Sequence, residues 1–119
     1  MRATPADLPI AAKVPGRLTS RLAQWGEFDV VVETIAPGDP TEAFRALPDG
    51  RCQCPHWGYL VKGRLRVKYP DGEEIVSAGD VFHWPAGHIP AVEQEAEIIE
   101  FSPAGEYLKV MGALGGPPA

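Results

Sequence analysis

The amino-acid sequence predicts an all-β fold, a single-domain barrel built from short strands. Three observations lead there. A length of 119 residues suits one hydrophobic core. Glycine and proline, 13 of each, make up about a fifth of the chain and indicate many turns. Runs rich in β-branched and aromatic residues recur about every ten residues, a spacing typical of sandwiches and barrels.

The first half of the chain contains two clear strand patterns. Residues 17–22 alternate between apolar and polar side chains, and residues 28–35 form a β-branched run that ends at the turn 37–40. Segment 41–47 is short and lies between two turn signals, so we expect it to be extended. Residues 1–16 are rich in alanine and proline without a period, and they predict a flexible N-terminal arm.

The second half contains several short strands separated by Pro-Asp-Gly, Ala-Gly-Asp and Pro-Ala-Gly turns. One helical turn is expected at 104–111. The small residues of 112–119 predict a disordered tail, so the barrel domain is expected to span 17–111. The strands are expected at 51–54, 56–62, 64–69, 73–77, 81–84, 91–92 and 97–101.

Composition argues against several classes of partner. The formal net charge is −5, whereas nucleic-acid binding needs a basic face. The one basic cluster has its charges at every second position, which indicates a solvated strand face. No apolar run approaches the ~20 residues of a membrane span, and no export signal is visible, so a soluble, cytoplasmic protein is expected. The basic residues are Lys62, Arg64, Arg66 and Lys68.

Two segments resemble the motifs of the cupin superfamily. The first, His56-Trp57-Gly58-Tyr59-Leu60-Val61-Lys62-Gly63-Arg64-Leu65-Arg66-Val67, is similar to the strand that carries the metal-binding residue and ends in a Leu-x-Gly-like turn. The second, Gly79-Asp80-Val81-Phe82-His83-Trp84-Pro85-Ala86-Gly87-His88, is similar to the Gly-Asp and Pro-x-Gly opening of the second motif. The resemblance implies a double-stranded β-helix, or jelly-roll barrel, with a pocket inside.

The expected ligand positions of that family are only partly kept. The first motif usually has His-x-His followed by a glutamate, but here Gly50 and Cys52 occupy the His-x-His positions and His56 replaces the glutamate. The second motif usually has a histidine where Pro90 stands, and His88 lies two positions earlier. The pattern resembles a divergent cupin subgroup with His-x-Gly-Tyr and Pro-x-Gly-His signatures.

Four residues are candidate metal ligands. The resemblance implies that His56 and His88 converge inside the barrel, and imidazole is the commonest metal ligand. Cys52 stands at a ligand position, and in an extended chain Cys54 faces the same side. Thiolate and imidazole together indicate a divalent transition metal, zinc or iron. Two alternatives stay open: the histidines contact a ligand without any metal, or they are structural.

Three aromatic residues flank the histidines. Trp57, Tyr59 and Trp84 are candidates for the wall of a small-molecule pocket. Packing in the core or in a dimer interface explains them as well, and a homodimer is expected from the family resemblance.

The remaining titratable residues have weaker assignments. His83 alternates with Val81 and is a candidate for a role behind the metal ligands. A row of three glutamates at alternate positions indicates a solvated face. A cysteine–histidine nucleophile pair is conceivable, but no orienting third group can be named. The glutamates are Glu93, Glu95 and Glu97.

The sequence therefore predicts a small metal-binding cupin that binds or acts on a small organic molecule. The alternative is a metal-free sensor or carrier module that binds a small ligand without catalysis. The residues do not decide whether the protein is an enzyme.

Overall fold

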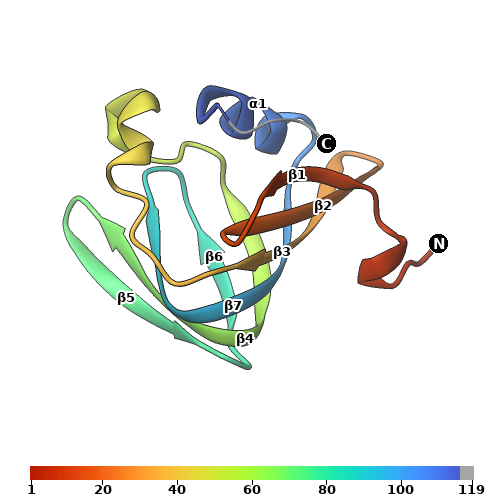
Figure 1. Cartoon of the computed structure of the whole chain (residues 1–119). Helices are drawn as coiled ribbons and strands as arrows, with labels where there is room; N and C mark the ends of the chain where they lie inside the picture. The colour runs from red at the N-terminus through yellow and green to blue at the C-terminus, as the bar shows by residue number, and fades with distance from the viewer. Residues whose placement is uncertain (116–119) are drawn as a thin grey trace.

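Seven antiparallel strands form one strongly curved sheet in the computed structural model, which describes residues 1–115. Their order is β1-β2-β3-β7-β4-β5, and β6 pairs with the first part of β4. The sheet curls into a barrel, as Figure 1 shows, so the all-β prediction is confirmed. The strands are β1 (Ile10–Val14), β2 (Leu18–Trp25), β3 (Phe28–Ile35), β4 (His56–Tyr69), β5 (Gly72–Ser77), β6 (Val81–Trp84) and β7 (Ile89–Pro103).

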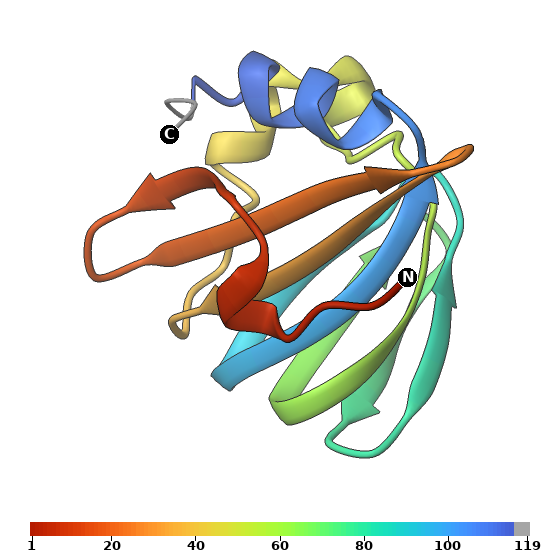
Figure 2. The same ribbon diagram turned by 90° about the vertical axis from the view of Figure 1, so that its right-hand side faces the viewer.

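Short helices lie mainly at one end of the barrel. Figures 1 and 2 place α1 (Glu106–Ala113) beside the 3-10 turns η2 (Ala43–Ala46) and η3 (Pro48–Gly50) at the same end. A further 3-10 turn, η1 (Pro5–Asp7), precedes β1. Every helix within residues 1–115 falls short of the length and hydropathy that a membrane span requires.

The N-terminal and 41–47 predictions need correction. Residues 10–14 form β1, paired with β2, where a flexible arm was expected. Ala12 is buried, so small side chains here serve close packing on the neighbouring strand and do not mark a loose segment. Residues 43–46 form a 3-10 turn in place of an extended segment, because Phe44 turns inward to join a buried cluster.

The C-terminal helix begins inside the expected helical turn and continues past it. It runs from Glu106 to Ala113, so two residues of the predicted tail are helical. Residues 116–119 of that tail lie outside the described residues. Segment 51–54, expected as a strand, contributes one isolated bridge between Cys52 and His88.

A bulge at Gly63 joins two predicted strands into β4 and changes which side chains face inward. Before it, His56 and Leu60 are buried, both at even positions. After it, Leu65 and Val67 are buried, both at odd positions. The register with β7 shifts at this point, and Gly63 has φ +97°. The bulge thus keeps the histidine inside while the basic residues that follow point to solvent.

Those basic residues form ion pairs on the outer surface. Arg64 and Arg66 both bind Glu93, with nitrogen–oxygen distances of 2.9 Å, and Lys62 lies 3.6 Å from Glu95. This agrees with a solvated, charged strand face for both rows of residues.

The barrel interior has two apolar clusters. The larger one fills the barrel between β4, β5, β6 and β7 and includes Leu60, Leu65 and Ile98. The smaller one lies beneath the helical end and includes Phe44, Cys54 and Ile89. Cys52, another predicted metal ligand, belongs to the smaller cluster as well, and the predicted ligands His56 and His88 are also buried.

Candidate metal centre

Three predicted ligands converge in the barrel. The ligand atoms of Cys52, His56 and His88 all lie within 4.8 Å of one another, and all three residues are buried. His56 begins β4, while His88 precedes β7. The imidazole centroids are 5.0 Å apart. Cys52 is held beside His88 because its backbone N–H donates to the His88 carbonyl over 3.0 Å.

The His88 ring has a fixed orientation. Its Nδ1 donates to the carbonyl oxygen of Pro85 over 2.8 Å, which leaves Nε2 with a free lone pair. This Nε2 is buried and has no hydrogen-bond partner within residues 1–115. An orphaned, inward-facing imidazole nitrogen beside a thiol and a second imidazole is what a transition metal would satisfy.

The His56 ring has different neighbours at its two nitrogens. Nδ1 forms a hydrogen bond of 2.6 Å with Oγ of Ser102, and Oε2 of Glu100 lies 3.8 Å away. Nε2 faces Sγ of Cys52 at 3.9 Å. Ser102 and Glu100 therefore orient the ring from behind, while Nε2 points to the thiol.

Cys54 is close to the centre but outside the group. Its Sγ lies 3.9 Å from Nδ1 of His56, the nitrogen that faces away from Cys52. Proline at position 55 interrupts the alternation, so the two thiols reach opposite sides of the His56 ring. Cys54 packs in the apolar cluster beneath the helices, and the group formed by Cys52, His56 and His88 does not include it.

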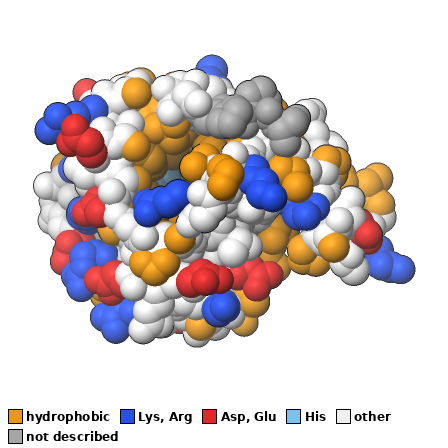
Figure 3. Space-filling view, in the orientation of Figure 1, with side chains coloured by type: hydrophobic (Ala, Val, Ile, Leu, Met, Phe, Trp, Pro, Cys, Tyr) orange, Lys and Arg blue, Asp and Glu red, His pale blue; other side chains and the backbone are white. Residues whose placement is uncertain are grey.

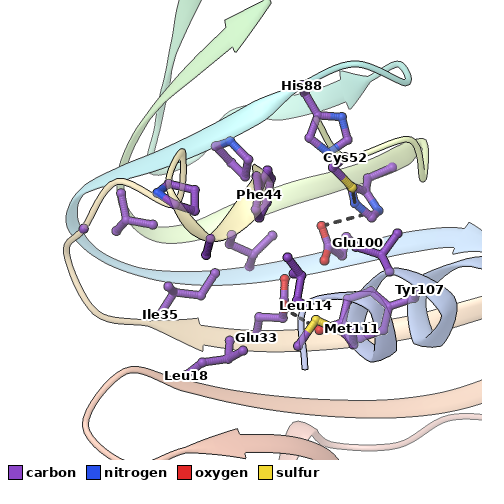
Figure 4. A pocket seen from close by; sticks show the side chains of 18 of the residues that line it. Leu18, Glu33, Ile35, Phe44, Cys52, His88, Glu100, Tyr107, Met111 and Leu114 are labelled. Carbon is purple, nitrogen blue, oxygen red and sulfur yellow. Dashed lines mark hydrogen bonds and ion pairs between the residues drawn. The ribbon is translucent and has the colours of Figure 1, made fainter. Parts of the chain in front are cut away.

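A cavity of about 240 Å³ opens beside the three ligands. Figure 3 shows a hollow edged by hydrophobic side chains, and Figure 4 shows His88, Cys52 and Glu100 along one side of it. Side chains from β2, β3, η2 and α1 make the other walls, including Leu18, Ile35, Phe44, Met111 and Leu114.

Solved structures identify the fold. An RmlC-like cupin from Shewanella frigidimarina aligns with a TM-score of 0.63 and 18% identity, covering 89% of this chain and 93% of that one. The chain has a cupin fold. A polyketide cyclase, RemF, from Streptomyces resistomycificus aligns with a TM-score of 0.60 and 17% identity, covering 87% and 78% of the two chains. An oxalate decarboxylase variant from Bacillus subtilis aligns with a TM-score of 0.57 and 18% identity, covering 87% of this chain and 29% of that one.

Sequence comparison adds no closer relative. No protein-family model matches this chain, and no curated protein matches it. At these identities the solved structures establish the fold, while the chemistry must be argued from the residues themselves.

Burial sets the protonation of the three ligands. It lowers the pKa of His56 to about 3, with a smaller contribution from the charge of His88, and it lowers the pKa of His88 as well. Both imidazoles are therefore neutral near pH 7, the form that binds metals. Burial also raises the pKa of the Cys52 thiol to about 12, so without a cation the sulfur keeps its proton.

Of the three aromatic residues predicted at the pocket wall, one lines the cavity. Trp84 is buried, lines the cavity and contacts both rings, with centroids 6.1 Å from His56 and 5.5 Å from His88. Trp57 and Tyr59 do not line this cavity: strand alternation turns them to the outer face, where each is more than 40% exposed. His83 stacks on Trp57 at 4.8 Å on that outer face, so it is not behind the metal ligands.

The sequence analysis did not identify two buried glutamates and a buried tyrosine as residues of this cavity. Glu33 and Glu100 both line the cavity, although one lies in β3 and the other in β7. The Tyr107 hydroxyl donates to Oε2 of Glu33 over 2.5 Å and contacts Ser20 Oγ at 2.5 Å. A charged residue inside each of two apolar runs, Val-Val-Val-Glu and Ile-Ile-Glu-Phe, was the available signal.

The two carboxyls influence each other. Burial raises the pKa of Glu100 well above its usual range, and the charge of Glu33 and a hydrogen bond with it raise it further. Glu100 Oε2 has no hydrogen-bond partner in the part of the chain that the structure describes. The cavity therefore has a group of candidate metal ligands and a carboxyl pair side by side.

Proposed function

We propose that this protein is a metal-binding cupin that holds a divalent transition metal through Cys52, His56 and His88 and binds a small organic molecule in the adjoining cavity. The observation that carries the proposal is the convergence of three buried ligand atoms within 4.8 Å, one of them an orphaned imidazole nitrogen. One thiolate and two imidazoles suit zinc or iron, and three protein ligands leave a coordination position open.

The bound cation would supply Lewis acidity at the cavity floor. The chain's own residues have three tasks there. The Pro85 carbonyl keeps the His88 proton on Nδ1 so that Nε2 stays available. Ser102 and Glu100 orient the His56 ring. The apolar walls exclude water and surround a ligand.

Two finer assignments accompany the proposal. A thiolate ligand must stay reduced, and both cysteines are free thiols, which favours a reducing compartment such as the cytoplasm. A homodimer is supported by exposed apolar side chains that adjoin one another on the outer face of four neighbouring strands. We call these the outer aromatic patch: Phe28, Trp57, Tyr59, Val81 and Phe101.

Metal analysis tests the central claim. Protein purified without added metal, or reconstituted with Zn²⁺ and dialysed, should contain near-stoichiometric metal by plasma mass spectrometry. The variants Cys52→Ser, His56→Ala and His88→Ala should fall to background. His83→Ala is the matched control, because this exposed imidazole lies on the outer face.

A spectroscopic experiment determines which of the two cysteines is a metal ligand. Protein loaded with Co²⁺ should show a thiolate-to-cobalt charge-transfer band that Cys52→Ser lacks and Cys54→Ser retains. Folded wild-type protein that takes up neither cation would contradict the proposal and favour the metal-free ligand carrier. Loss of the band in both cysteine variants would contradict the assigned ligand set.

A further inference from the structure

The size of the cavity limits what it can hold. An apolar protein cavity of about 150 Å³ is large enough for benzene, so a proportionate ligand for this one has roughly ten non-hydrogen atoms. Its volume is about 240 Å³. A fused two-ring molecule is of this size, whereas a sugar chain or a nucleotide is too large.

The walls of the cavity favour an apolar body. Apolar side chains from η2, from α1 and the residue after it, and from β3 line the cavity: Phe44, Val110, Met111, Leu114 and Ile35. Figure 4 shows Met111 and Leu114 beside the Glu33 side chain. The described lining residues include three formally charged ones, Arg17, Glu33 and Glu100, and of these only Arg17 is not buried.

The buried end of the cavity offers hydrogen-bond acceptors and no positive side chain. Glu100 is only 1% exposed, and its Oε2 has no hydrogen-bond partner among residues 1–115, while Glu33 accepts a hydrogen bond from Tyr107 at Oε2. Carboxyl oxygens accept a hydrogen bond from a hydroxyl group, and an ionised carboxylate repels an anionic group. The pair adjoins Nδ1 of His56, while the proposed metal would bind at Nε2 on the other side of that ring.

We propose that the cavity selects an uncharged, mainly apolar molecule of two-ring size whose hydroxyl group donates to the Glu33–Glu100 carboxyl pair. The inference rests on the proposed small-molecule function and names the ligand class for the same cavity. It does not need the metal, because the selecting groups are the carboxyls and the apolar walls.

A set of four probes of matched shape tests the selection. These are 2-naphthol, naphthalene, 2-naphthoate and 2-naphthylmethylammonium, which present a hydroxyl, no polar group, an anion and a cation. Binding to the full-length protein is measured by calorimetry at pH 7, with naphthalene measured in competition against 2-naphthol. Metal content is determined on the same batch, and the series is repeated after chelation.

We expect 2-naphthol to bind several-fold to about tenfold more tightly than naphthalene, the gain from one hydrogen bond. The affinity for 2-naphthol should also exceed the affinity for 2-naphthoate by at least about tenfold, because the carboxyl pair repels the anion. Glu33→Gln should raise the affinity for 2-naphthoate several-fold and leave that for naphthalene unchanged. Glu93→Gln, on the outer surface, should change neither affinity.

Three outcomes would overturn the inference: no binding of 2-naphthol at millimolar concentration, 2-naphthoate binding as tightly as 2-naphthol, or the ammonium probe binding more tightly. The wild-type series decides this even if Glu33→Gln fails to fold. A metal-free protein that still prefers 2-naphthol would contradict only the metal proposal. A metal-loaded protein without that preference would contradict only the ligand class.

Discussion

The Tyr107 hydroxyl links three elements through one buried contact point. It donates to Glu33 in β3 and contacts Ser20 in β2, while its own backbone lies in α1. All three residues are buried, so neither polar partner has ready access to water. A side chain of this kind both holds the helix over the cavity and keeps a carboxyl in place beneath it.

The Tyr107→Phe variant should lower the free energy of unfolding by about 1–3 kcal/mol, because a buried carboxyl and a buried hydroxyl lose their partner. Urea denaturation measures the change. Tyr59→Phe is the matched control, since the Tyr59 ring is 42% exposed, and it should stay within about 0.5 kcal/mol of wild type. Equal stability of Tyr107→Phe and wild type would show that the contact contributes little.

Strand β4 is the element that connects the site to the surface. Its first part places His56 inside the barrel, and its second part places arginines outside, with the Gly63 bulge between them. Two features of the bulge require glycine at this position. Its φ of +97° is unfavourable for other residues, and a Cβ would lie 2.3 Å from the Glu95 carbonyl oxygen.

Gly63→Ala should therefore destabilise the fold by at least about 1–3 kcal/mol, through backbone strain and the collision with β7. Gly72→Ala is the control, because a Cβ at Gly72 would have no heavy atom within 4 Å and the residue has no positive φ. Thermal unfolding followed by circular dichroism compares the two. If both variants melt together with wild type, the bulge is not the constraint we infer.

The molecule as a whole has titratable side chains in its interior and an apolar patch on its outer face. The radius of gyration is 13.2 Å, close to the ~13.5 Å expected for one domain of this length. Its interior holds the imidazoles, the thiol and the carboxyls. Its outer aromatic patch contains Val81, which is 81% exposed, beside Tyr59 on the neighbouring strand. Such a surface is typical of a contact between protein molecules.

Val81→Asp should convert a wild-type dimer into a monomer, because a charge within an apolar interface is costly to bury. Sedimentation velocity over a range of concentrations measures the change in mass. Ile75→Asp, on β5 and outside the patch, should leave the dimer intact although Ile75 is 39% exposed. A monomeric wild-type protein at every concentration would exclude the proposed homodimer.

Local patterns were enough to predict the barrel. Turn residues at regular intervals and alternating strands depend on neighbours in the chain, so 28–35, 73–77 and 81–84 were predicted close to their observed bounds. The same reasoning failed for residues 10–14, whose strand depends on pairing with β2, and for 43–46, whose turn depends on burying Phe44.

The amino-acid sequence by itself determined the fold class and singled out two motif histidines, because the turn signals and the motifs are patterns of residues close together in the chain. Only the tertiary structure decided that Cys52 and not Cys54 joins them, that Trp57 faces outward, and that Glu33, Glu100 and Tyr107 meet beside the cavity. The physical reason is that one bulge or one proline reverses the face of every later side chain. A contact such as that between Glu33 and Tyr107, 74 positions apart, exists only once the sheet has closed.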